Sequence, residues 1–185
     1  MHHSGSWILL CFVGLSIAAI LLLLRLTSLG RIINQDLPDR PRRRLFYASV
    51  GFLVTFAAVR LLVASITHHV GPFGWVEMHG VHIHHLVWGI LILLLCGYGE
   101  LTELGDGDTP VSILLSRLLA LSYGVGSALT LDEFALWLNL NPQAYWSPQG
   151  RESLDAIILF GALLSIGTWG APLFRHLFRG RSQSR

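Results

Sequence analysis

The chain has 185 residues, of which 52% are hydrophobic and only 13% are charged, and its mean hydropathy is +0.57. Because soluble globular domains carry about 25% charged residues, this composition excludes an ordinary soluble domain and predicts an integral membrane protein. The net charge is only +2, and all 13 basic side chains are arginines grouped in a few segments. This distribution indicates an orientation in a membrane rather than a nucleic-acid partner.

Five segments are apolar over about the 20 residues that a helix needs to cross a membrane. In chain order they are residues 7–29, 45–66, 84–101, 111–131 and 154–174. The first has no Arg or Lys before it and no small-x-small cleavage site before Arg25, so we expect a retained helix rather than a signal peptide. Since the connecting loops are short, residues 1–185 are predicted to form one all-α domain, a bundle of five transmembrane helices.

The arginines predict how this bundle is oriented. One group lies in the loop after the first span and the other in the tail; they comprise Arg31, Arg40, Arg42, Arg43 and Arg44, and Arg175, Arg179, Arg181 and Arg185. Basic residues accumulate on the cytoplasmic side of membrane proteins. We therefore expect the amino terminus outside, the carboxyl terminus in the cytoplasm, and a multi-pass protein of the inner (plasma) membrane.

A histidine-rich run precedes the third predicted span. The segment Glu77–Gly89 reads EMHGVHIHHLVWG and contains His79, His82, His84 and His85. The fourth span starts inside, and at 1.5 Å per residue its end at Asp132 lies about 30 Å further along, back at the outer boundary. Histidines and carboxylates are therefore predicted to share one level at the outer face, where ionisable groups are expensive to keep.

Helical phase indicates which of these residues face one another. At 100° per residue, His82 and His85 fall on one face of the third helix and His84 points elsewhere. The fourth span places Ala120, Gly124, Ala128 and Asp132 at intervals of four, a spacing of small residues that favours close helix contact in lipid. On the second span, Arg60 and His68 are expected near the same level. Three helices are thus predicted to direct polar residues to one place.

Imidazole nitrogens together with carboxylate oxygens suit zinc, iron or manganese. We therefore expect a divalent metal site formed by His79, His82, His85 and Asp132, in a layer that also contains Arg60 and His68. Such a site, open to the outside, could activate a water for hydrolysis of a lipid or amphiphile, with Glu133 as general base.

Other interpretations of the same residues remain open. In one of them, the sole role of Asp132 is that of counter-ion to Arg60, in a salt bridge that holds two helices together. The chain is then a non-catalytic subunit of a larger membrane complex, in which the histidines ligate a haem or chlorophyll-type cofactor or have no ligand. A further alternative is a component of a system that transports metal ions or protons. Membrane lipids are the expected partners, and assembly into a homo-oligomer or a larger membrane complex is left open. The sequence contains no GxSxG, phosphate-loop, HExxH or CxxCH motif.

Several segments of the chain resemble a group of bacterial integral membrane proteins. The resemblance rests on HIHHLVWGI (His82–Ile90), GYGE (Gly97–Glu100), GVGSALTLDEFALWL (Gly124–Leu138) and YWSPQGRESLDAI (Tyr145–Ile157). It covers roughly residues 79–158. It implies a bacterial inner-membrane protein, and it implies no particular activity, cofactor or site residue.

Overall fold

The computed structural model describes residues 37, 39–70, 77–78, 81–82, 84–139 and 151–170. Its elements in chain order are α3 (Arg40–Thr67), β1 (Glu77–Met78), β2 (Val81–His82), α4 (His85–Leu101), α5 (Pro110–Asp132), α6 (Phe134–Asn139), α7 (Arg151–Ser165) and the π-helix η3 (Ile166–Gly170). The predicted span 7–29 lies outside the described residues. Apart from the two-residue strands, which pair antiparallel with Glu77 opposite His82, the described elements are helical, as predicted.

The described helices coincide with four of the predicted spans. α3 begins five residues before the predicted span, where Asp39 is the N-cap residue and a proline stands in the first turn. α5 begins after Thr109, whose side-chain oxygen accepts a hydrogen bond from the backbone N–H of Ser112 at 3.1 Å. Such an N-cap satisfies one of the free N–H groups of the first turn. The last predicted span corresponds to α7 and η3 together, up to residue 170.

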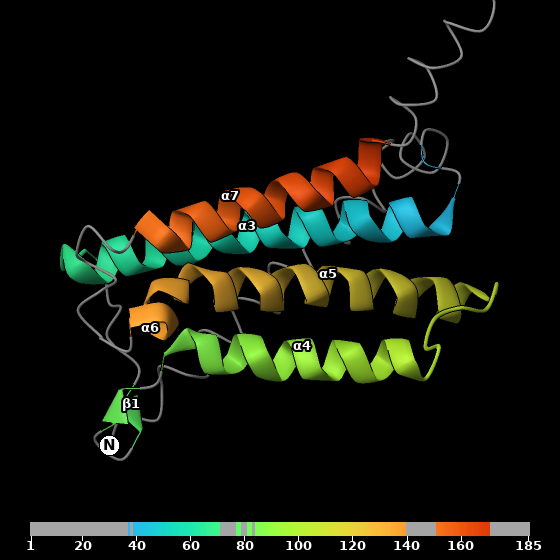
Figure 1. The fold of residues 1–185 in the computed structure, drawn as a ribbon. Coiled ribbons are helices and arrows are strands. Elements are labelled where there is room, and N and C mark those ends of the chain that lie inside the picture. Colours follow the sequence, from blue (N-terminus) through green and yellow to red (C-terminus); the bar gives the residue numbers. More distant parts are fainter. Residues whose placement is uncertain are drawn as a thin grey trace, which may run out of the picture.

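α5 occupies the centre of the bundle, with α3 on one side and α4 on the other, and α7 lies beside α3 (Figure 1). Ion pairs reveal the helix directions. Arg40 at the start of α3 pairs with Asp108 before α5, and Arg60 near the end of α3 pairs with Asp132 at the end of α5, so these helices are parallel. His85 at the start of α4 contacts Asp132, so α4 runs antiparallel to both.

Glycines allow α5 to approach both neighbours closely. A Cβ atom added at Gly124 would clash with the backbone carbonyl oxygen of Ala48 in α3. On the other side, a Cβ atom at Gly89 of α4 would lie 2.5 Å from Thr130 Oγ1 and 2.8 Å from the Gly126 carbonyl oxygen. The predicted stripe is confirmed, since Ala120, Gly124, Ala128 and Asp132 are all buried. Small residues at such contacts let the helix backbones meet.

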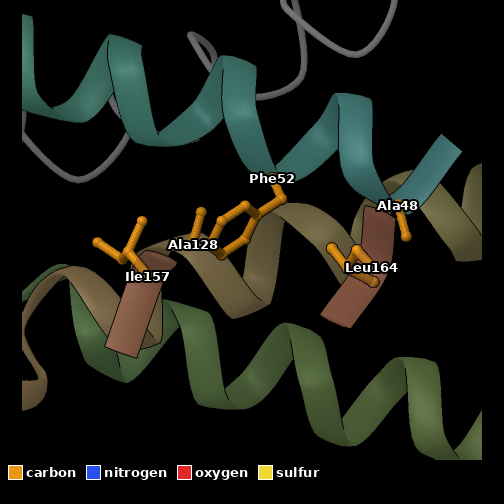
Figure 2. Packing of buried hydrophobic residues seen from close by; sticks show 5 residues of the cluster. All are labelled: Ala48, Phe52, Ala128, Ile157 and Leu164. Atoms are coloured by element: carbon orange, nitrogen blue, oxygen red, sulfur yellow. The ribbon is translucent and has the colours of Figure 1, made fainter. Parts of the chain in front are cut away.

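Two apolar clusters fill the space between the helices. In the first, Phe52 of α3 points toward Ala128 of α5, with Ile157 and Leu164 of α7 on either side (Figure 2). The second consists of Val59, Val125 and Leu129, and Trp88 of α4 packs against it. Val59 and Leu129 are close in sequence to Arg60 and Asp132, so this second cluster packs directly beneath the polar end of the bundle.

Two of the described helices, α3 and α5, are long and apolar enough to cross a membrane, judged by length and composition. α4 is apolar but shorter, with 17 residues. The prediction of an α-helical bundle is therefore confirmed for the described residues. The number of spans and their orientation stay predictions.

Candidate functional site

The candidate site lies where the end of α5, the start of α4 and the last turns of α3 meet. Asp132 is the last residue of α5 and Glu133 is its C-cap residue. His85 is the first residue of α4, and His84 precedes it as N-cap residue with an extended backbone. Because α5 and α4 are antiparallel, these consecutive pairs of residues face each other. We call His84, His85, Asp132 and Glu133 the polar cluster.

Asp132 lies at the centre of this cluster and is completely buried. Its Oδ1 is 2.5 Å from Nε of Arg60, and its Oδ2 is 3.1 Å from Nε2 of His85. The Arg60 guanidinium also lies over the ring of Phe56, 5.4 Å from the ring centroid, a distance typical of a cation–π contact. The Asp132 carboxylate therefore connects α3 to α4 through α5.

Glu133 is almost as buried as Asp132, with 5% of its surface exposed. Its Oε2 accepts a hydrogen bond from the backbone N–H of Leu86 at 2.9 Å, and its Oε1 lies 2.8 Å from Nδ1 of His84 and 3.5 Å from Nδ1 of His85. His84 makes no side-chain cap bond of its own. Glu133 thus caps α4 from another helix, where a carboxylate is favoured by the helix dipole.

The charges of the cluster and its partner Arg60 do not balance when both histidines are neutral. Asp132 and Glu133 bring two negative charges, and Arg60 brings one positive charge. Both carboxylates are buried, and buried charge is costly unless it is compensated. One further positive charge, either a proton on an imidazole or a bound cation, would neutralise the group.

The predicted helical face of the third span is wrong at its outer end. His82 lies in β2 rather than in a helix, and the backbone of His84 is extended, with φ −69° and ψ 140°. Helical phase therefore does not apply before His85. As a result His84, which was expected to point elsewhere, contacts Glu133, while the side chains of His82 and His79 lie outside the described residues.

Of the remaining residues predicted for this layer, the structure brings some together and leaves one apart. The meeting of Arg60, His85 and Asp132 is confirmed. His68 is the C-cap residue of α3 and is exposed, and the contacts found for the polar cluster do not include it. The long side chain of Arg60, from two turns earlier in α3, takes the place expected for His68.

Helical phase does not predict two groups of the candidate site, namely the His84 side chain and the backbone N–H of Leu86. One signal was present in the sequence. The apolar run of the third span is preceded by His84 and not by Ser, Thr, Asp or Asn, the residues that usually cap helices. The free N–H groups of that helix therefore required a partner from elsewhere, and Glu133 was the nearest candidate at that level.

The donor chemistry of the cluster suits a divalent metal. In a tetrahedral site with bonds of about 2.1 Å, ligand atoms lie about 3.4 Å apart. The Nδ1 atom of His85 lies 3.5 Å from Glu133 Oε1, near that spacing, whereas the Nδ1 atom of His84 lies 2.8 Å from the same oxygen, at a hydrogen-bond distance. Among the described residues, however, no group of three or more His, Cys, Asp or Glu side chains is arranged as a ready-made metal site. Instead, these donor atoms contact one another.

A comparison with protein families, curated proteins and solved structures finds no match for this chain. The resemblance noted from the sequence therefore stays a prediction.

Proposed function

We propose that this chain is an integral membrane protein that crosses the inner membrane five times, with the polar cluster at the outer face. The outward faces of the described helices support the proposal, because large apolar side chains are exposed along them. They include Leu53 and Leu61 of α3, Leu94 and Leu95 of α4, Val111 of α5, and Ile158 and Leu159 of α7. In water such a surface would be a liability, whereas lipid tails solvate it.

We further propose that the polar cluster binds one divalent metal ion, namely zinc, iron or manganese. The observation that supports it best is the approach of two imidazole Nδ1 atoms, from His84 and His85, to one buried oxygen of Glu133. In this proposal Asp132 holds Nε2 of His85, as carboxylates commonly do for metal-binding histidines. His79 or His82, which were predicted as ligands, can complete the coordination.

A metal with an open coordination position would supply activated water for hydrolysis of a lipid or amphiphile. Within this proposal, Arg60 and Asp132 fix the orientation of His85. Glu133 was predicted as a general base, but both of its oxygens already have partners in Leu86 and His84. We therefore propose Glu133 as a ligand and assign it no proton transfer.

The Arg60–Asp132 pair favours a second candidate, a non-catalytic membrane subunit in which the polar cluster only joins three helices. A transport role has less support. Between Arg44 and Arg60 in α3, His85 and Glu100 in α4, and Arg117 and Asp132 in α5, the described helices contain no Asp, Glu, His, Lys or Arg. An ion path through these helices would need such groups or an oligomeric pore.

The metal proposal predicts about one zinc, iron or manganese ion per purified chain, measured by mass spectrometry of the protein in mild detergent. The variant His85→Ala is expected to lose at least about 90% of the bound metal. Removal of a metal ligand, or of a residue that orients a ligand, lowers the affinity for the metal about tenfold or more. The melting temperature of the wild-type chain should also fall after treatment with a chelator, because a metal bound only by the folded state stabilises it.

The matched control is His68→Ala, which removes an exposed histidine from the same end of the bundle and should leave the metal content unchanged. Wild-type protein without metal after supplementation with all three ions would contradict the metal proposal. A chelator-insensitive protein that is still destabilised by Asp132→Asn would favour the non-catalytic subunit.

The proposed orientation predicts opposite labelling of two exposed positions in a chain whose cysteines are replaced by alanine. Val70 follows α3 at the outer end, and Thr102 follows α4 at the inner end. In intact spheroplasts, a membrane-impermeant maleimide should label Val70→Cys and should label Thr102→Cys only after lysis. The reverse pattern would invert the orientation, and equal labelling of both before lysis would contradict the membrane crossing of α4.

A further inference from the structure

The opposite end of the bundle contains a cleft of about 200 Å³ between the first turns of α3 and α5. Half of its eight lining residues are arginines, namely Arg40, Arg43, Arg44 and Arg117, and the only acidic one is Asp108. The cleft lies far from the polar cluster. Arg117 and Asp132 are 15 residues apart in the same helix, which corresponds to about 22 Å.

Some of these arginines are held in place by the loop between α4 and α5. Arg40 pairs with Asp108 at 2.6 Å and donates to the Gly107 carbonyl oxygen at 3.1 Å. Arg44 pairs with Glu100 and, at 3.3 Å, with Asp106. These contacts fix the wall of the cleft, and with the three acidic partners Glu100, Asp106 and Asp108 counted, its four arginines leave a net charge of +1.

Two hydroxyl groups line the same cleft from buried side chains. Tyr47 is 2% exposed and Ser116 is 6% exposed, and the guanidinium of Arg117 lies 5.6 Å from the centre of the Tyr47 ring. No hydrogen bond joins either hydroxyl to another residue in the described part of the chain. Among the described residues, the buried side-chain atoms without a hydrogen-bond partner do not include either hydroxyl oxygen, so both oxygens open to the cleft, where they can donate to the oxygens of a ligand.

The helix directions add to this preference for an anion. α3 and α5 both begin at this end, so the positive ends of two helix dipoles face the same region. Arginine is the residue that best matches the oxygens of a phosphate group, and hydroxyls complete such sites as donors. The net positive charge, the hydroxyl donors and the volume of the cleft therefore favour the same class of ligand.

We propose that this cleft binds a phosphate group of net negative charge. Two sources have this chemistry, the headgroup of an anionic phospholipid and a soluble phosphate. In the proposed orientation the cleft lies at the cytoplasmic leaflet, where anionic lipids attract basic residues near the membrane. The inference does not depend on the metal proposal, because the two sites share no residue.

The test uses the full chain in a nonionic detergent at constant ionic strength. Its melting temperature is measured against increasing phosphatidylglycerol, phosphatidylcholine or inorganic phosphate. Phosphatidylglycerol should stabilise the wild type, and Arg117→Gln should weaken its apparent affinity about tenfold, as expected for loss of one charge-assisted contact. Tyr47→Phe keeps the ring under Arg117 and should weaken the affinity severalfold without changing the melting temperature of the ligand-free chain.

The control is Arg42→Gln, which removes the same charge from the first turn of α3, the helix that supplies the other three arginines of the cleft. Arg42 pairs with Asp39 at 2.9 Å and does not line the cleft, so its variant should bind as the wild type does. Stabilisation by phosphatidylglycerol alone would identify a lipid site, and stabilisation by inorganic phosphate would identify a soluble ligand. Equal stabilisation by phosphatidylcholine, no stabilisation at all, or an equal loss in Arg42→Gln and Arg117→Gln would overturn the proposal.

Discussion

The variant Asp132→Asn is expected to lose about 3 kcal/mol of the free energy of unfolding, as breaking a buried ion pair usually does. Asp132 is completely buried, and it balances Arg60 at 2.5 Å while it accepts from His85 at 3.1 Å. The amide has nearly the same shape but no charge, so the positive charge of Arg60 remains without its counter-ion. We place the loss at the low end of the usual range because 32% of the Arg60 side chain is exposed. Titration with a denaturing detergent in mixed micelles, after metal removal, measures it.

Asp106→Asn is the matched control, with the same chemical change in an exposed pair. Asp106 lies 3.3 Å from Arg44 and 48% of its side chain is exposed, so its loss should be at most about 0.5 kcal/mol. In a double-mutant cycle, Arg60→Gln should cost much less in the Asp132→Asn background than in the wild type. Equal losses for Asp132→Asn and Asp106→Asn would show that the buried pair does not join the helices.

Much of the helical bundle could be predicted because its determinants are local or periodic. Apolar length predicted α3, α4 and α5 to within a few residues at each end. The spacing of Gly124, Ala128 and Asp132 identified the face of α5 that packs inward, since residues four apart lie above one another on a helix. Asp132 ends that stripe, and this position predicted its contact with a polar residue of a neighbouring helix.

The details of the candidate site depended on information that periodicity does not contain. His82 and His84 were assigned by extending the phase of α4 backward, but the helix begins only at His85 because the backbone is extended at His84. Where a helix begins is determined by its cap, and here Glu133 of another segment caps it through the Leu86 N–H. Such a long-range contact cannot be inferred from the residues around the histidines alone.

The α3–α5 contact depends on the absence of a side chain at Gly124. Gly124→Ala is expected to lower the free energy of unfolding by about 3 kcal/mol, because overpacking of a tight contact forces backbone shifts. The added Cβ would clash with the Ala48 carbonyl oxygen and lie 2.8 Å from the Phe52 backbone nitrogen. Backbone atoms cannot rotate away, so α3 and α5 must separate, and the packing of Phe52 against Ala128 weakens with them. The same detergent titration measures the loss.

Gly97→Ala is the control, because a Cβ atom there would meet nothing within 4 Å. Alanine favours a helix over glycine by about 1 kcal/mol, so this variant should be as stable as the wild type or slightly more stable. Ala48→Gly should not rescue Gly124→Ala, because the obstacle is the carbonyl oxygen of Ala48 and not its methyl group. Rescue by Ala48→Gly, or equal stability of the Gly124 and Gly97 variants, would mean that the helix backbones do not meet at this position.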